Sequence, residues 1–301
     1  MVEHPVERRL PAREFTFVKG HGAHNDFIVL PDPDDRIRLD PADVVHLCHR
    51  RAGIGADGLL RAVRCTAHPE AVGMAGEAEW FMDYRNADGS TGTMCGNGIR
   101  VLARYLADAS LLPHGSTTIA TRAGVRTLHI PARHSQDRTI TVDMGHPRLP
   151  GDTDITVSAG GRRWPALHVD MGNPHAVAFV EDLTHPGDLR TPPAVTPGEA
   201  YPDGVTVEFV VPHTPRHLAL RVHERGVGET SACGTGACAA VTALRQRERH
   251  AGAGTYTVDV PGGRLHVTVH DDGTMILGGP AVIVADGMVW LTPDAITARS
   301  R

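Results

Sequence analysis

The amino-acid sequence contains very little lysine. Lys19 is the only one in a chain of 301 residues, so it alone could form the Schiff base of a pyridoxal-phosphate enzyme. It lies beside a Gly/His-rich turn segment at residues 20–26, and no phosphate-binding glycine loop is nearby. The sequence therefore disfavours a pyridoxal-phosphate enzyme, and we expect the protein to need no cofactor.

Cysteine is scarce as well, and its number is odd. The five cysteines are Cys48, Cys65, Cys95, Cys233 and Cys238. Such a set disfavours a disulfide scaffold and is typical of a reducing compartment, so we expect a cytoplasmic protein. The spacing of Cys233 and Cys238 is not that of a zinc knuckle, and the 19 histidines are scattered without a His-Glu-x-x-His pattern. We therefore expect no metal site.

Long apolar runs are absent too. None approaches the roughly 18 residues that a membrane helix needs, and the charged N-terminal residues lack the apolar core of a signal peptide. The net charge is −5 with no basic stretch, so we expect neither a membrane nor a nucleic acid as a partner. The apolar content of 41% is that of a globular protein, and the length allows one large domain or two of about 150 residues.

The chain does contain many short strand patterns separated by proline and glycine. Alternating or short apolar runs predict strands at residues 15–19, 27–30, 79–84, 205–211, 218–223, 256–260 and 265–270. A helical period predicts helices at residues 41–51, 98–109 and 236–247.

One short loop pattern occurs twice, each time before a predicted helix. Met94-Cys95-Gly96-Asn97-Gly98 and Ala232-Cys233-Gly234-Thr235-Gly236 both read x-Cys-Gly-x-Gly. Asn86 and Glu224 precede the two cysteines by the same distance, each before a turn that contains glycine. The pattern indicates two homologous halves that face each other, and a chance match of two glycine-rich strings is the alternative.

A cysteine at the start of a helix has a distinctive chemistry. The first helical turn presents unpaired N–H groups, which lower the pKa of a thiol there and can bind a carboxylate. If two such loops face each other, Cys95 can take a proton from a carbon while Cys233 returns one to the opposite face, or the reverse. The N–H groups would stabilise the carbanion-like intermediate next to a carboxylate. We expect Cys48, Cys65 and Cys238 to be buried small hydrophobes instead.

The two loops resemble the paired signatures of the diaminopimelate epimerase family. Further segments fit the family in the same order, at residues 19–27, 53–58, 85–90, 171–175, 224–230 and 279–281. The resemblance implies an α/β (α+β) fold of two pseudo-symmetric domains, each a curled β-sheet or barrel around a central helix. It places the active site in the cleft between the domains.

The resemblance also implies a division of the chain and an activity. Residues 1–136 would form the N-terminal half, to which residues 279–301 return, and residues 137–278 would form the C-terminal half. The implied activity is the cofactor-independent interconversion of L,L- and meso-diaminopimelate by a cysteine thiol and thiolate, for lysine and cell-wall synthesis. Members of the family are commonly homodimers.

Site residues follow from the resemblance, position by position. Cys95 and Cys233 would be catalytic, and the backbone N–H groups of Gly96, Asn97, Gly234 and Thr235 would bind the reacting carboxylate. Asn25, Asn86, Asn173 and Arg225 would bind the substrate, and His175 and Glu224 would lie beside the cysteines. The planar Arg225 side chain suits the distal carboxylate of diaminopimelate. From local sequence alone, Asn25 and Asn86 could be turn residues and Arg225 a solvated charge.

Thr206 departs from the family pattern, which usually has Asn at this substrate-binding position. Threonine is shorter and lacks the amide, and losing a hydrogen bond to a charged group costs about 1.5–3 kcal/mol. The departure leaves two interpretations open: a diaminopimelate epimerase that tolerates Thr206, or a racemase of the same fold for another amino acid or a hydroxyproline-like substrate. A redox protein that uses Cys95 and Cys233 as a dithiol is a third, less favoured one.

Overall fold

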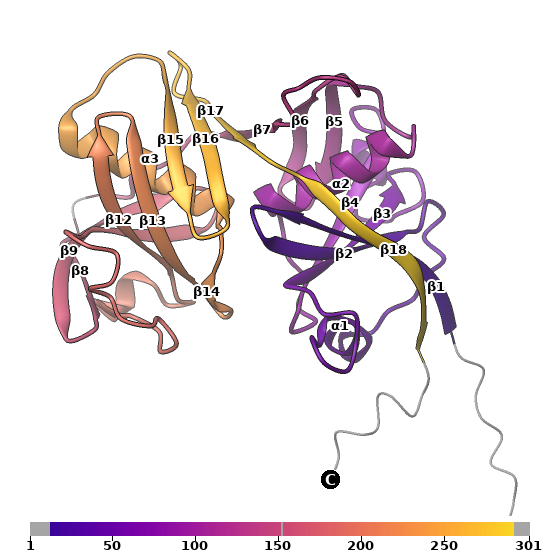
Figure 1. Ribbon diagram of the computed structural model, residues 1–301, viewed down its shortest axis with the longest axis horizontal. Helices are drawn as coiled ribbons and strands as arrows, with labels where there is room; N and C mark the ends of the chain where they lie inside the picture. Colours follow the sequence, from indigo (N-terminus) through magenta and orange to yellow (C-terminus); the bar gives the residue numbers. More distant parts are fainter. Residues whose placement is uncertain (1–12, 152, 292–301) are drawn as a thin grey trace, which may run out of the picture.

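The computed structural model describes residues 13–151 and 153–291, which form two lobes joined by a few strands (Figure 1). The first lobe contains β1 (Arg13–Gly22), β2 (Asn25–Pro31), α1 (Pro41–Cys48), β3 (Gly58–Arg64), η1 (Val72–Met74), β4 (Trp80–Asn86), α2 (Gly96–Asp108), β5 (Gly115–Thr121), β6 (Gly124–Ile130), β7 (Ile140–Gly145) and β18 (Val282–Leu291). The second contains β8 (Ile155–Ala159), β9 (Arg162–Asp170), β10 (Pro174–Phe179), β11 (Ala194–Thr196), η2 (Gly198–Ala200), β12 (Thr206–Thr214), β13 (His217–Glu224), β14 (Gly228–Thr230), α3 (Gly234–Glu248), β15 (Gly254–Val260), β16 (Gly263–Val269) and β17 (Met275–Gly279).

The strands pair in the same pattern in both lobes. In the first, neighbouring strands run in the order β18, β1, β2, β3, β4, β5, β6, β7. In the second, the order is β8, β9, β10, β12, β13, β15, β16, β17, with β11 on β8 and β14 on β13. The parallel pairs are β2·β3 and β4·β5 in one lobe and β10·β12 and β13·β15 in the other. Each strand of the first lobe therefore has a counterpart in the second, and β11 and β14 are additions to the second.

The two lobes are joined at β7 and β17, which pair antiparallel with Val142 opposite Leu277. Each of these strands leads into the other lobe. In the second lobe, β8 follows β7 and pairs with β9; in the first lobe, β18 follows β17 and pairs with β1. Figure 1 shows β18 crossing from one lobe to the other alongside β1. The junction is thus itself approximately two-fold symmetric, with β7 and β17 in equivalent positions.

Each curled sheet surrounds one helix, and this accounts for the composition of α2 and α3. Ile99, Val101, Leu102 and Leu106 of α2 are fully buried. In α3 the residues from Gly236 to Leu244 are buried and mostly small, which lets the surrounding strands approach closely. The α/β fold of two similar lobes with a central helix is as predicted. The division of the chain at residue 136 remains a prediction. Of the residues assigned to the N-terminal half, 1–12 and 292–301 lie outside those that the structure describes.

The predicted elements are present, with shifted ends. The first helix begins at Pro41 after a capping box between Asp40 and Asp43, but it ends at Cys48 rather than at residue 51. The chain turns back there, because the N–H groups of Ile54 and Gly55 both donate to the Leu47 carbonyl at 3.0 Å. The prediction missed β3, β5 to β11 and β14, and it did not place the strands at 275–279 and 282–291.

Candidate active site

The two cysteines of the repeated loop occupy equivalent backbone positions. Cys95 is the N-cap of α2 and Cys233 is the N-cap of α3, and both have extended backbone angles. The N–H of Gly98 donates to the Cys95 sulfur at 3.3 Å, and the N–H of Gly236 donates to the Cys233 sulfur at the same distance. Each sulfur thus takes the place of the side-chain oxygen that usually caps a helix.

The N-termini of the two helices meet at the junction of the lobes. A Cβ on Gly234 would lie 3.4 Å from the Cα of Gly96, and a Cβ on either glycine would lie within 2.9 Å of Leu277. Only residues without side chains allow this approach. As a result, the unpaired N–H groups of both first turns face one region, where their partial positive charges add.

A cavity of about 880 Å³ opens at this meeting point and is walled by both lobes. Its lining includes the predicted residues Asn25, Asn86, Cys95, Gly96, Asn97, Asn173, Thr206, Glu224, Arg225, Cys233, Gly234 and Thr235. Segments far apart in the sequence therefore contribute to one site. The exception is His175, which is fully buried behind the wall.

On the Cys95 side, amide groups surround the thiol. The Cys95 sulfur lies 3.8 Å from Oδ1 of Asn25, and that oxygen also accepts from Nδ2 of Asn97 at 3.2 Å. Nδ2 of Asn97 donates in addition to the carbonyl of Ala232, the residue before Cys233, at 3.0 Å. Nδ2 of Asn25 donates to Asp57 at 2.9 Å, which orients its oxygen toward the thiol. The Asn97 amide thereby connects the two cysteine loops.

On the Cys233 side, hydroxyl and carboxyl groups surround the thiol. The Cys233 sulfur lies 3.4 Å from Oγ1 of Thr235. Glu224 ends β13 and accepts a hydrogen bond from the hydroxyl of Thr230. The Thr206 hydroxyl accepts from the backbone N–H of Arg225 at 3.3 Å, so it supports the residue predicted to bind the distal carboxylate.

His175 and Glu208 form a pair beneath the Cys233 loop. Both side chains are fully buried, and Nδ1 of His175 lies 2.6 Å from Oε1 of Glu208. The other atom of each group, Nε2 of His175 and Oε2 of Glu208, has no hydrogen-bond partner among the described residues. His175 is thus close to the loop, but its predicted contact with substrate remains untested.

The expected lowering of the thiol pKa values is wrong, because both values are raised. Burial raises the pKa of Cys95 to about 11; the N–H of Gly98 opposes this rise and the Glu224 carboxylate adds to it. Burial raises the pKa of Cys233 further, helped by the carboxylates of Glu224 and Glu208. Burial also raises the pKa of Glu224, to about 7. The helix N-termini lower the thiol pKa values, but desolvation is the larger effect.

The other cysteines are buried, as predicted, and all five are free thiols. Burial raises the pKa of Cys48 and of Cys238 to about 12. Cys48 also contributes to the cavity wall beside Ala56. Neither side chain is placed like Cys95 or Cys233, because neither caps a helix.

Sequence reasoning did not single out several residues of the cavity wall. Tyr84 donates from its hydroxyl to Oδ1 of Asn86 at 2.7 Å and fixes that amide. Asp57 orients Asn25, and Arg126 lines the cavity, its Nε having no partner among the residues that the structure describes. Asp57 belongs to residues 53–58, one of the segments that match the family, so the sequence did contain a signal for its role. Nothing in the local sequence around Arg126 indicates its position.

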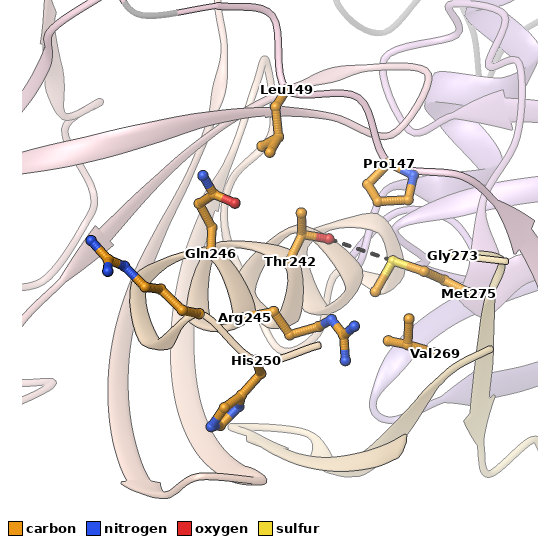
Figure 2. Close-up of a pocket in the computed structure, with 10 residues that line it drawn as sticks. Pro147, Leu149, Thr242, Arg245, Gln246, His250, Val269, Gly273 and Met275 are labelled. Carbon is orange, nitrogen blue, oxygen red and sulfur yellow. Dashed lines mark hydrogen bonds between the residues drawn. The ribbon is translucent and has the colours of Figure 1, made fainter. Parts of the chain in front are cut away.

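A second hollow, of about 480 Å³, lies at the far end of α3 and differs in kind (Figure 2). Its wall holds Arg245, Arg249 and His250 but no thiol or carboxylate, so it offers no base of the kind found between the lobes.

Within residues 13–151 and 153–291, no group of three His, Cys, Asp or Glu residues is placed to hold a metal ion. In the same part of the chain, no helix is long and apolar enough to span a membrane.

Comparisons with known proteins agree with this geometry. The sequence model of the diaminopimelate epimerase family matches residues 17–150 and 167–284. The diaminopimelate epimerase of Streptomyces coelicolor is 58% identical over 276 residues, which cover 90% of this chain and 94% of that protein. That of Thermobifida fusca is 44% identical over 282 residues, covering 92% and 98%.

Solved structures with low sequence identity share the fold. A hydroxyproline epimerase from Agrobacterium vitis superimposes with a TM-score of 0.70 at 15% identity, covering 96% of both chains. A phenazine biosynthesis protein from Bacillus anthracis gives 0.68 at 16% identity, covering 93% of this chain and all of that one. Together with the family match over most of the sequence, these findings show that the chain belongs to the diaminopimelate epimerase family.

Proposed function

We propose that this protein is a two-base epimerase that interconverts L,L- and meso-diaminopimelate. The observation that carries the proposal is the placement of Cys95 and Cys233 as N-caps of two helices that meet in one cavity. A substrate α-carbon between the two sulfurs would have one thiol on each face. The two halves, residues 1–136 with 279–301 and residues 137–278, would each supply one base.

The substrate carboxylate next to the reacting carbon would bind at the helix N-termini. The N–H groups of Gly96, Asn97, Gly234 and Thr235 are its donors in this proposal. Charge that develops on the carboxylate oxygens in the transition state would be stabilised by donors already in place. Arg225 would hold the distal carboxylate, while the amide oxygens of Asn86 and Asn173 accept from the distal ammonium.

The proton transfers require one thiolate, yet the raised pKa values keep both thiols protonated near neutral pH. Burial raises the pKa of Glu224 to about 7, and its carboxylate interacts with both thiols. We assign to it the removal of the Cys233 proton when substrate fills the cavity. The thiolate then takes the α-proton, and the Cys95 thiol donates its proton to the opposite face. Turnover exchanges the protonation of the two sulfurs, so the reaction runs in both directions.

The reaction would need no pyridoxal phosphate. The one lysine, Lys19, pairs with Asp26 at 2.6 Å, donates to the Gly55 carbonyl and is not part of the cavity wall. The developing negative charge would instead be stabilised by the helix N-termini. Each preorganised donor of this kind is worth about 3–4 kcal/mol in comparable sites.

Deuterium uptake tests the proposal. Reduced protein is incubated without pyridoxal phosphate with L,L-diaminopimelate in heavy water, and the α-proton is followed by NMR. We expect exchange together with formation of the meso isomer. Absence of exchange in protein whose thiols are shown to be free by titration would contradict the proposal.

Thr206 favours a second candidate, an epimerase of the same fold that acts on another amino acid. The residue is only 5% exposed and its hydroxyl accepts from the N–H of Arg225, so it offers the distal end of a substrate less than an asparagine would. A panel of other amino acids in the same exchange experiment separates the candidates. Exchange with one of them and none with diaminopimelate would favour this second function.

We further propose a homodimer that forms through β18. Val282, Val284, Met288 and Trp290 all lie on its outer face, and each is at least 42% exposed. Among the described strands β18 pairs with β1 alone, so its other edge is free for a second copy. Light scattering should give twice the chain mass for the wild type and a smaller mass for Trp290→Glu.

Five free thiols suit the cytoplasm, where lysine and cell-wall precursors are made.

A further inference from the structure

Arg100 is a fully buried arginine without a carboxylate partner. It lies in the second turn of α2, and its side chain is 0% exposed. Other buried arginines are paired: Arg61 with Asp83 at 2.7 Å, and Arg104, one turn further along α2, with Asp108 at 3.5 Å. Within the described residues, Arg100 makes hydrogen bonds only to neutral groups, and its Nε has no partner.

The surrounding backbone is built to hold this guanidinium group. A Cβ on Gly279 would lie 2.9 Å from its NH2 nitrogen, and one on Gly22 would lie 3.4 Å from the same atom. Gly279 ends β17 and Gly22 ends β1, so strands on both sides of α2 leave room for it. The guanidinium group is therefore enclosed next to the N-terminus of α2 rather than exposed to solvent.

The hydrogen bonds of Arg100 all go to the start of α2. NH1 donates to the Gly96 carbonyl at 2.9 Å, and NH2 donates to Oδ1 of Asn97 at 2.7 Å. Because the Asn97 oxygen is taken, its Nδ2 must face Asn25 and Ala232, to which it donates. Arg100 thus fixes the amide that joins the Cys95 loop to the Cys233 loop.

A buried cation at this place is unfavourable without a counter-charge. Burying a charge without a counter-ion is energetically costly, and the N-terminus of a helix already carries partial positive charge. The titratable groups that its charge reaches are the thiols Cys95 and Cys238, the second of which occupies the matching position in α3. Both are neutral at pH 7, since burial raises their pKa values.

We infer that the missing counter-charge of Arg100 is the anion formed in the active site, and that Arg100 is a positioning residue for the reaction. Its charge stabilises the Cys95 thiolate and the carboxylate bound at Gly96 and Asn97. Its hydrogen bonds hold Asn97 in the orientation that both loops need. The inference rests on the proposed two-cysteine function and assigns to that site a second source of positive charge besides the helix N-termini.

The test reads the thiol directly, in protein without substrate. The rate of Cys95 alkylation by iodoacetamide is measured against pH, with the labelled peptide quantified by mass spectrometry. Cys95 also faces Glu224 and Tyr84, and both are unchanged in every variant. In Arg100→Gln, we expect the midpoint to move up by about one pH unit or more, as when a thiolate loses a nearby opposite charge. In Arg100→Lys, which keeps the charge, the midpoint should stay at the wild-type value.

Turnover supplies the second readout. Arg100→Gln should lose about 10²-fold in kcat, similar to the loss of one preorganised donor, with little change in KM. Arg104→Gln is the matched control on the same helix and should keep both the midpoint and kcat. An unshifted midpoint in folded Arg100→Gln overturns the inference. If that variant does not fold, a shift of one unit in Arg100→Lys overturns it. Inactivity of the wild type would refute the proposed function instead, and the alkylation profiles would still decide the role of Arg100.

Discussion

The two cysteine loops have the same backbone but different residues beneath them. In the first lobe, a Cβ on Gly98 would meet Leu60 at 3.3 Å and Phe27 at 3.4 Å. In the second lobe, a Cβ on Gly236 would meet the Oε1 atom of Glu208 at 2.6 Å. One loop therefore lies on apolar side chains and the other on a carboxyl group.

The strand register shows that these are equivalent positions. Phe27 of β2 pairs with Gly58 of β3, and His175 of β10 pairs with Thr206 of β12. Leu60 and Glu208 each stand two residues further along the second strand of the pair. The apolar pair Phe27 and Leu60 in one lobe thus corresponds to the polar pair His175 and Glu208 in the other.

This difference shows that the two loops share a backbone conformation while their sulfur atoms differ in proton affinity. Both loops present a sulfur in the same way, because the N-cap geometry depends only on the Cys-Gly-x-Gly backbone. The proton affinity of each sulfur depends on what lies around it. Burial raises the pKa of both thiols; the charge of Arg100 opposes this rise at Cys95, whereas the carboxylates of Glu224 and Glu208 add to it at Cys233. The two bases are therefore equivalent in position and unequal in charge environment.

Removal of either sulfur should have the largest effect. We expect Cys95→Ala and Cys233→Ala each to lose about 10²–10⁴-fold or more in kcat, the usual contribution of a positioned acid or base. The loss should be similar in both variants, because each direction of the reaction needs both groups. Coupled assay of L,L- and of meso-diaminopimelate measures it. Full turnover in either variant would show that the loops are not a pair of bases.

The repeated loop made this part of the site predictable from the sequence. A thiol, two glycines and a helix start are local features, so Cys95 and Cys233 could be recognised without a fold. The lobes were predictable for the same reason, since the loop occurs twice. The thiol pKa values were not, because desolvation depends on strands distant in sequence. Glu208 and Arg100 were missed because a single charged residue in an apolar segment does not reveal its partner, or the lack of one.

Replacement of Glu224 tests whether the Cys233 side has its own proton acceptor. We expect kcat of the wild type to follow a bell-shaped pH profile, because the reaction needs one thiolate and one thiol. Glu224→Gln should reduce kcat by about 10²-fold and remove the acidic limb of that profile, which is set by a group whose pKa is about 7. The basic limb, which reports the thiol pair, should remain. An unchanged acidic limb would assign it to another group.

The same variant should change the stability. The folded pKa of Glu224, about 7, is above the unfolded value of 4.5, so its contribution is fully present below pH 4.5 and is lost as the pH rises through 7. The loss is at most about 3 kcal/mol, and less where cavity water screens the group. Urea unfolding at pH 5 and pH 8 should therefore show a smaller decline for Glu224→Gln than for the wild type.

Copying the first lobe into the second tests the buried pair. Glu208→Leu leaves Nδ1 of His175 without its partner and should lower the free energy of unfolding by about 1–3 kcal/mol. Adding His175→Phe, so that both positions match Leu60 and Phe27, should recover most of that loss, because two apolar groups need no partner. Denaturant unfolding of both variants measures this.

The control for that series is Glu208→Gln, which keeps an acceptor for His175. It should lie within about 1 kcal/mol of the wild type. If the double variant is less stable than Glu208→Leu alone, the two lobes differ in shape here and not only in polarity.

The smallest expected effect concerns the distal end of the substrate, where Thr206 occupies the position that corresponds to Gly58. Thr206→Asn would add an amide to the cavity wall, and one further hydrogen bond to a charged group is worth about 1.5 kcal/mol at the low end. We expect KM for diaminopimelate to fall by up to about tenfold with kcat nearly unchanged, because the amide would contact the substrate equally in the ground and transition states. The Thr206 hydroxyl also accepts from the Arg225 N–H, and the asparagine oxygen can take over that bond, so Arg225 should stay in place.

Thr206→Val is the control: it keeps the volume, removes the acceptor and should raise KM. If KM is the same in all three proteins, the second lobe selects its substrate through Arg225 and Glu224, and position 206 has no part in it.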